Sequence, residues 1–153
     1  METLQELGYG PIDLVCVNLY PFVETAAREP PATDSELIEM IDIGGPTMVR
    51  SAAKNHKDVI VLTSPSQYEG IIEKLRVADG NPSAIDMETR ANLALESFQG
   101  TAAYDTAVSN ELESRLSDKR TPSRVQRSSQ TGTSLRYGAV SYTHLTLPTI
   151  LRV

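Results

Sequence analysis

The sequence predicts an α/β domain with parallel strands, because two apolar strand-like runs enclose two helical segments. Ile12–Leu19 is rich in β-branched residues and almost continuously apolar, as buried strands are. Asp34–Met40 and Pro46–Asn55 have helical patterns, and Val59–Thr63 is a second apolar run. A strand, two helices and a strand in this order imply a parallel pair joined by a crossover. We therefore expect a parallel sheet with flanking helices.

Cap and turn residues delimit the first helices. Thr33–Glu36 has the pattern of a capping box, which starts the first helix. Val23–Pro31 ends in two prolines that exclude helix, so this stretch is expected to be a loop. Gly44-Gly45 is interpreted as a hinge, since glycine tolerates the backbone angles that a sharp reversal needs. Pro46 then suits the first turn of the second helix.

Pro46–Asn55 has an apolar face and a cationic face. Met48, Val49, Ala52 and Ala53 are expected to lie together on the buried side.

The remainder of the domain is predicted to be helical. Ser64–Gln67 has the pattern of a helix start, and the helix that follows is expected to end near Ala78. Asp86 caps a longer helix, in which Gly100 is expected to produce a break or a bend. Thr101–Leu116 continues as helix.

Charge divides the chain near Ser117. Residues 1–116 hold 8 basic and 19 acidic side chains, whereas residues 117–153 hold 6 basic and 1 acidic. Residues 117–134 are rich in Ser, Thr, Arg and Gln, which is typical of a linker. The acidic body lacks the basic surface that nucleic-acid binding normally needs. We therefore expect no nucleic-acid partner.

The single cysteine, Cys16, excludes an internal disulfide and suits a reducing, cytoplasmic location. It lies inside an apolar run, so we expect a buried, unreactive thiol. No apolar stretch reaches the length of a membrane span, and no membrane partner is expected. No spacing of His, Cys, Asp or Glu suggests a metal site.

The stretch around Gly44-Gly45 combines groups that would hold an anion. Asp42 supplies a carboxylate, and the helix start supplies unpaired N–H groups in a positive dipole field. Arg50 and Lys54 are two cations one turn apart. From the residues alone, these cations would more simply be a solvated helix face. An anionic or oxyanion-forming ligand is the alternative that the whole stretch supports.

Three motifs resemble one enzyme family. Ile41–Gly45 and Arg50–His56 resemble a segment of the bifunctional purine-biosynthesis family, which joins an IMP cyclohydrolase to an AICAR transformylase. Asn18–Phe22 resembles the N-L-Y-P-F motif of that family, and Thr101–Asp105 resembles a further segment. That last segment usually follows a histidine, where this chain has Gly100. The resemblance runs from about Pro11 to Gly138.

The resemblance implies a partial methylglyoxal-synthase-like fold. Residues 1–116 would be part of the IMP cyclohydrolase domain, and residues 117–134 the linker. Residues 135–138 would open the transformylase domain, and residues 139–153 look like an artefactual tail. Two strands are few for a stable sheet, so we expect a fragment, truncated at both ends, that does not work alone.

The resemblance also implies the chemistry, which is closure of formyl-AICAR to IMP with loss of water. Asp42 would be the base or orienting carboxylate, Lys54 the proton donor, and Tyr20 a hydrogen-bonding catalytic group. The remaining candidates are expected to bind substrate: Asn18, Ile43, Gly44, Gly45 and Arg50.

The implied cofactors and partners follow from the same family. The cyclohydrolase step is expected to need no cofactor and no metal, and the transformylase domain would use 10-formyltetrahydrofolate. The partner molecules would be a small nucleotide substrate and a second copy of the protein in a homodimer. Two alternatives remain open: a non-catalytic nucleotide-binding regulatory module of the same fold, as in carbamoyl phosphate synthetase, or an inactive fragment.

Overall fold

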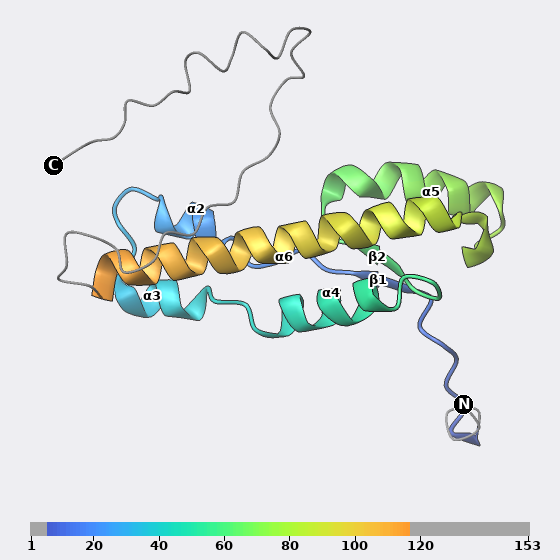
Figure 1. The fold of residues 1–153 in the computed structure, drawn as a ribbon, viewed down its shortest axis with the longest axis horizontal. Coiled ribbons are helices and arrows are strands. Elements are labelled where there is room, and N and C mark those ends of the chain that lie inside the picture. Colours follow the sequence, from blue (N-terminus) through green and yellow to red (C-terminus); the bar gives the residue numbers. More distant parts are fainter. Residues whose placement is uncertain (1–5, 117–153) are drawn as a thin grey trace, which may run out of the picture.

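The computed structural model describes residues 6–116, and these form an α/β arrangement in which one long helix contacts most other elements (Figure 1). The predictions for residues 117–134, 135–138 and 139–153 concern residues outside this described part. In chain order the elements are β1 (Leu14–Cys16), α2 (Phe22–Ala26), α3 (Asp34–Glu39), α4 (Gly44–Lys54), β2 (Ile60–Leu62), the 3₁₀ turn η1 (Pro65–Gln67), α5 (Tyr68–Val77), the 3₁₀ turn η2 (Pro82–Ala84) and α6 (Met87–Leu116).

The sheet contains two parallel strands in the described residues, as the element order predicts. Leu14 pairs with Ile60 and Cys16 with Leu62. All three residues of β2 are buried, because α4 and α6 pack against this strand. The expectation of a long buried first strand is wrong, since β1 spans three residues and Cys16 is exposed. Within the described residues β1 pairs only with β2, so its other edge has no strand partner in this part of the chain.

The expected loop after the first strand contains a helix. α2 begins at Phe22, directly after a proline. The Pro21 carbonyl accepts hydrogen bonds from both the amide (3.0 Å) and the hydroxyl (2.9 Å) of Thr25, which closes the first turn. Phe22 is 1% exposed, and its burial stabilises this short helix by tertiary packing. Pro30 and Pro31 therefore exclude helix only at the end of the segment, beyond α2.

The capping box before α3 is confirmed. The Glu36 amide donates to the Thr33 hydroxyl, and the Glu36 carboxylate accepts from the Thr33 amide at 2.9 Å. The Arg28 guanidinium lies 2.6 Å from the same carboxylate. Hydrogen bonds from Arg28 and Thr33 lower the pKa of Glu36 to about 2.

The longest helix, α6, runs through Gly100 without interruption, so the expected break is wrong. Buried neighbours on either side, Ser97 and Thr101, are each 1% exposed and hold this part of the helix against the rest of the fold. At its C-terminal end, Arg115 donates to the Ala32 carbonyl at 2.9 Å and to the Asp34 carboxylate at 2.8 Å. These contacts join the end of α6 to the start of α3.

The core consists of two clusters along α6. The larger one joins β2, α4 and α5 to the N-terminal half of α6. The smaller one contains Phe22, Leu37 and Tyr104, from α2, α3 and the C-terminal half of α6. Leu19 packs against both clusters. Met48 was expected on the buried face of α4 but is 52% exposed, whereas Val49 is 1% exposed.

Gly100→Ala is predicted to raise the free energy of unfolding by about 0.5–1 kcal/mol, because Gly100 lies in an uninterrupted helix interior. A Cβ atom there would meet no atom within 4 Å. Urea denaturation of the 153-residue chain measures the change. A loss of stability would show that the helix depends on glycine at this position.

Candidate functional site

The Asp42 carboxylate caps α4 and holds the segment after β1. Its Oδ1 accepts a hydrogen bond from the Gly45 amide at 2.7 Å. Its Oδ2 accepts one from the Tyr20 amide at 3.3 Å. A carboxylate at this position satisfies an unpaired helix N–H and interacts favourably with the helix dipole. One side chain therefore joins two segments that are 22 residues apart in the sequence.

Tyr104 of α6 supports the same segment from the buried side. Its hydroxyl accepts from the Asp42 amide at 2.8 Å and donates to the Met40 carbonyl at 2.9 Å. Its ring meets the edge of Phe22 at a centroid distance of 6.1 Å. Tyr104 was not among the predicted site residues, although it lies in the Thr101–Asp105 motif. We call Asp42, Tyr20, Gly45, Met40 and Tyr104 the Asp42 network.

Glycine is required at position 45 because the Asp42 carboxylate approaches its backbone closely. A Cβ atom at this position would overlap the Asp42 carboxylate. Gly44 and Gly45 are the first residues of α4, and neither has a positive φ. The hinge interpretation is therefore wrong: the structure needs Gly45 for space beside the carboxylate and not for unusual backbone angles.

Two exposed backbone donors lie beside the capped amide. Ile43 is 74% exposed and Gly44 is also exposed. In the described part of the chain, neither amide donates a hydrogen bond to a protein group. Adjacent free N–H groups at a helix start are suited to an anion or a developing oxyanion.

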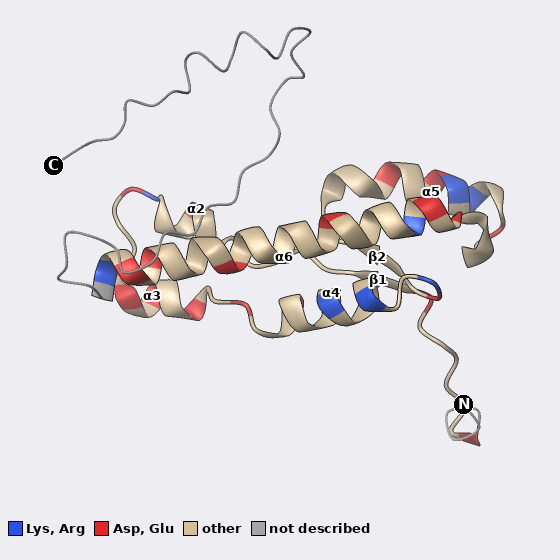
Figure 2. Cartoon of the chain, viewed as in Figure 1, with Lys and Arg blue, Asp and Glu red and all other residues tan. Residues whose placement is uncertain are grey.

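The two predicted cations lie further along α4, which carries basic but no acidic side chains (Figure 2). The Arg50 guanidinium lies 5.4 Å from the ring centroid of Phe98 on α6, a cation–π contact. Lys54 is the last residue of α4, about 15 Å along the helix axis from Gly44 at 1.5 Å per residue. The structure therefore does not bring Lys54 next to the helix start.

Asn18 and the Tyr20 side chain lie in the segment that follows β1. The Tyr68 hydroxyl donates to Asn18 Oδ1 at 2.7 Å, so this amide oxygen has a partner on α5. The pKa of Tyr68 is raised, first by its hydrogen bond with Cys16 and then by burial. Tyr20 is 54% exposed, and its backbone rather than its hydroxyl contacts Asp42.

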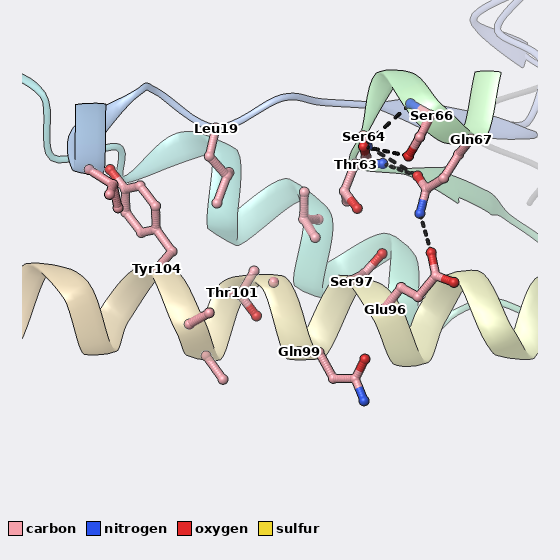
Figure 3. A pocket seen from close by; sticks show the side chains of 15 residues that line it. Leu19, Thr63, Ser64, Ser66, Gln67, Glu96, Ser97, Gln99, Thr101 and Tyr104 are labelled. Atoms are coloured by element: carbon pink, nitrogen blue, oxygen red, sulfur yellow. Dashed lines mark hydrogen bonds between the residues drawn. The ribbon is translucent and has the colours of Figure 1, made fainter. Parts of the chain in front are cut away.

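A cavity of about 910 Å³ lies between the carboxyl ends of the strands and α6 (Figure 3). Leu19, Thr63, Ser64 and Gln67 line one side, and the stretch of α6 from Glu96 to Tyr104 lines the other. None of the residues predicted to form the site lines this cavity. Tyr104 links the two regions, because it belongs to the Asp42 network and also lines the cavity. This cavity was not predicted from the sequence.

The comparisons with known proteins decide the family. A model of the AICARFT/IMPCHase bienzyme family matches residues 52–143. The chain belongs to this family. Two curated relatives are each named bifunctional purine biosynthesis protein PurH. The one from Petrotoga mobilis is 51% identical over 119 residues, and the one from Synechococcus sp. is 52% identical over 120 residues.

The alignments with the two PurH relatives cover much of this chain but little of the relatives. Each alignment covers 78% of the chain and 22% of the PurH protein, so the chain spans about a fifth of their length. Among solved structures, the crystal structure of ForH is similar with a TM-score of 0.63 and 38% identity. That match covers 74% of this chain and 56% of the ForH chain.

Residues 6–116 contain no group of three or more His, Cys, Asp or Glu side chains that could hold a metal ion. No helix in this part of the chain is long and apolar enough to cross a membrane.

Gly45→Ala is predicted to destabilise the chain by about 1–3 kcal/mol, since the added Cβ displaces the carboxylate that caps α4. Urea denaturation measures the effect, and Gly100→Ala is the matched control with the opposite sign. Equal stabilisation by both substitutions would contradict the close approach.

Tyr104→Phe is predicted to destabilise the chain by about 1–3 kcal/mol near neutral pH, because it leaves two backbone groups without their partner. Burial raises the pKa of Tyr104 above its ordinary value of 10.0. The folded state therefore binds this proton more tightly than the unfolded state does. The associated stability is complete below pH 10 and is lost as the pH rises through the folded pKa.

Denaturation of the wild type and of Tyr104→Phe between pH 8 and pH 12 checks this sign. The stability difference between the two proteins should shrink at the alkaline end. A constant difference would contradict the assigned shift.

Proposed function

We propose that this chain supplies part of an IMP cyclohydrolase site that acts in de novo purine biosynthesis. Membership of the AICARFT/IMPCHase family and the PurH relatives support the pathway. The parallel strand pair and the helices around it are compatible with a methylglyoxal-synthase-like fold, which we propose for the domain. A cytoplasmic location fits this role.

The observation that supports the reaction best is the pair of free amides beside the Asp42 cap. In the proposed step the carboxamide nitrogen of formyl-AICAR attacks the formyl carbon and loses a proton. Negative charge develops on the formyl oxygen, and the N–H groups of Ile43 and Gly44 stabilise it. The oxygen then gains two protons and leaves as water, while the formamido nitrogen loses its proton and forms the C=N bond of the new ring of IMP.

Asp42 acts in this proposal as the orienting carboxylate. Both of its oxygens accept backbone N–H groups, which fixes α4 relative to the segment after β1. The exposed Tyr20 side chain lies in that segment, and we propose that its hydroxyl hydrogen-bonds the substrate. We propose Asn18 as a further substrate-binding residue, and the hydrogen bond from the Tyr68 hydroxyl positions its side chain. Precise placement of such groups is what accelerates a ring closure.

The cations of α4 attract the anionic substrate. Arg50 is one helical turn nearer the free amides than Lys54 is, so it suits contact with the anion. We assign to Lys54 the protonation of the departing oxygen through an intervening water, because its flexible side chain, even extended back along the exposed flank of α4, does not itself span the roughly 15 Å to Gly44. Of the proposed roles, this one depends on the largest side-chain movement.

The proposed partners follow the family. The substrate is a small nucleotide, the cyclohydrolase step uses no cofactor or metal, and the whole protein is a homodimer. The transformylase domain of the whole protein would use 10-formyltetrahydrofolate.

The test uses a full-length protein that contains this sequence, assayed for conversion of formyl-AICAR to IMP. Asp42→Ala and Lys54→Ala are each expected to lower kcat by roughly a hundredfold or more. Lys57→Ala is the matched control, because Lys57 is an exposed lysine just beyond α4. Asp42→Asn retains an acceptor for the Gly45 amide and should therefore lose less activity than Asp42→Ala.

Full activity of both alanine variants would remove these residues from the mechanism. Nucleotide binding without turnover by the wild type would instead indicate a regulatory module.

A further inference from the structure

The alternation of exposed and half-buried residues in β1 continues past the end of the strand. Its exposed members are Cys16, Asn18 and Tyr20, and the residues between them are half-buried. The Val17 amide donates to the Leu62 carbonyl at 2.9 Å, so pairing with β2 also extends beyond Cys16. Side chains two residues apart in an extended chain point to the same side. The three exposed side chains therefore form one row, which we call the Asn18 row.

Tyr68, the first residue of α5, reaches the Asn18 row from the side. Its hydroxyl donates to Asn18 Oδ1 at 2.7 Å, the usual length for an O–H donor, and the Cys16 thiol is its second partner. The Tyr68 ring is half-buried and packs against the larger core cluster, which holds the hydroxyl in place.

The protonation state of this hydroxyl suits a donor. The hydrogen bond with Cys16, and then burial, raise the pKa of Tyr68 above its ordinary value of 10.0. The hydroxyl therefore keeps its proton near neutral pH and continues to donate to Asn18.

The hydrogen bond from Tyr68 determines which end of the Asn18 amide is free. A carboxamide has an acceptor oxygen on one branch and two N–H donors on the other. Because Oδ1 is turned toward the Tyr68 hydroxyl, the N–H groups are directed away from it. Within residues 6–116, Asn18 Nδ2 donates to no protein group, and the side chain is exposed. Asn18 therefore offers donors to a ligand that lies on this row.

The Asn18 row is continuous with the Asp42 network. Tyr20 is the last member of the row, and its amide donates to Asp42 Oδ2 at 3.3 Å. The contact between Tyr68 and Asn18 thus connects α5 to the segment that Asp42 holds against the start of α4. None of the predicted site residues lies on α5, so this helix adds an element to the site.

We propose that Tyr68 is a positioning residue, which orients Asn18 as a hydrogen-bond donor to a carbonyl oxygen of the substrate. This inference rests on the proposed cyclohydrolase function and deepens it. The formyl and carboxamide groups of formyl-AICAR both offer such an oxygen. A side chain that is already oriented loses less conformational freedom when the substrate binds, so the Tyr68 hydroxyl contributes to affinity without touching the substrate.

NMR of the 153-residue chain tests the orientation without any reaction. Tyr68→Phe keeps the packed ring and removes the hydroxyl, so the order parameter of the Asn18 side-chain amide should fall. Cys16→Ala is the matched control, because it removes the other partner of the same hydroxyl and should leave this order parameter near the wild-type value. An Asn18 amide that is equally ordered in the wild type and in Tyr68→Phe would overturn the proposal.

Steady-state kinetics of a full-length protein that contains this sequence test the role in formyl-AICAR cyclisation. Asn18→Ala is expected to raise KM about tenfold or more, because the substrate oxygen loses its donor. Tyr68→Phe should raise KM about three- to tenfold with kcat within about twofold of the wild type, because Asn18 remains but is no longer oriented. The double variant should match Asn18→Ala within about twofold, since Tyr68 acts only through Asn18.

Asn18→Asp separates a donor role from an acceptor role. The carboxylate still accepts from Tyr68 but has no N–H groups, so KM should rise at least as much as in Asn18→Ala. Wild-type KM in Tyr68→Phe or in Asn18→Asp, or additive losses in the double variant, would overturn this role alone. No conversion of formyl-AICAR by the wild type would overturn the proposed function and this role with it.

Discussion

The structure depends on the contact between the Asp42 carboxylate and two backbone amides. One amide starts α4, and the other lies just after β1. Because the same residue's amide donates to Tyr104, the contact also fixes α6. Three segments that are distant in the sequence thus meet at one short loop, and the exposed donors of Ile43 and Gly44 take their positions from it.

Much of the fold follows from local patterns. The capping box at Thr33 and the helix that begins beside Gly44 are predictable, because adjacent residues determine them. The parallel strand pair follows instead from the order of strands and helices along the chain. The extent of β1 is not predictable, since burial of a strand depends on which neighbours cover it. α2 was missed because the packing of Phe22 against Tyr104 outweighs the proline signal.

The site was predictable in part. The motif around Asp42 and Gly45 indicates a functional stretch, but only the structure shows that the carboxylate is a helix cap and that Gly45 makes room for it. Tyr104 lies 62 residues from Asp42, so no local pattern could pair them. The cavity was also not predictable, because its lining combines the segment after β2 with α6, two parts of the chain that no local pattern pairs.

Amide hydrogen exchange measured by NMR tests the central claim most directly. In the wild type the Gly45 and Tyr20 amides should be protected, while those of Ile43 and Gly44 exchange rapidly. Asp42→Ala should remove the protection of Gly45 and Tyr20 together and leave the β2 amides protected. A wild-type Gly45 amide that exchanges as fast as that of Gly44 would show that the carboxylate does not hold this loop.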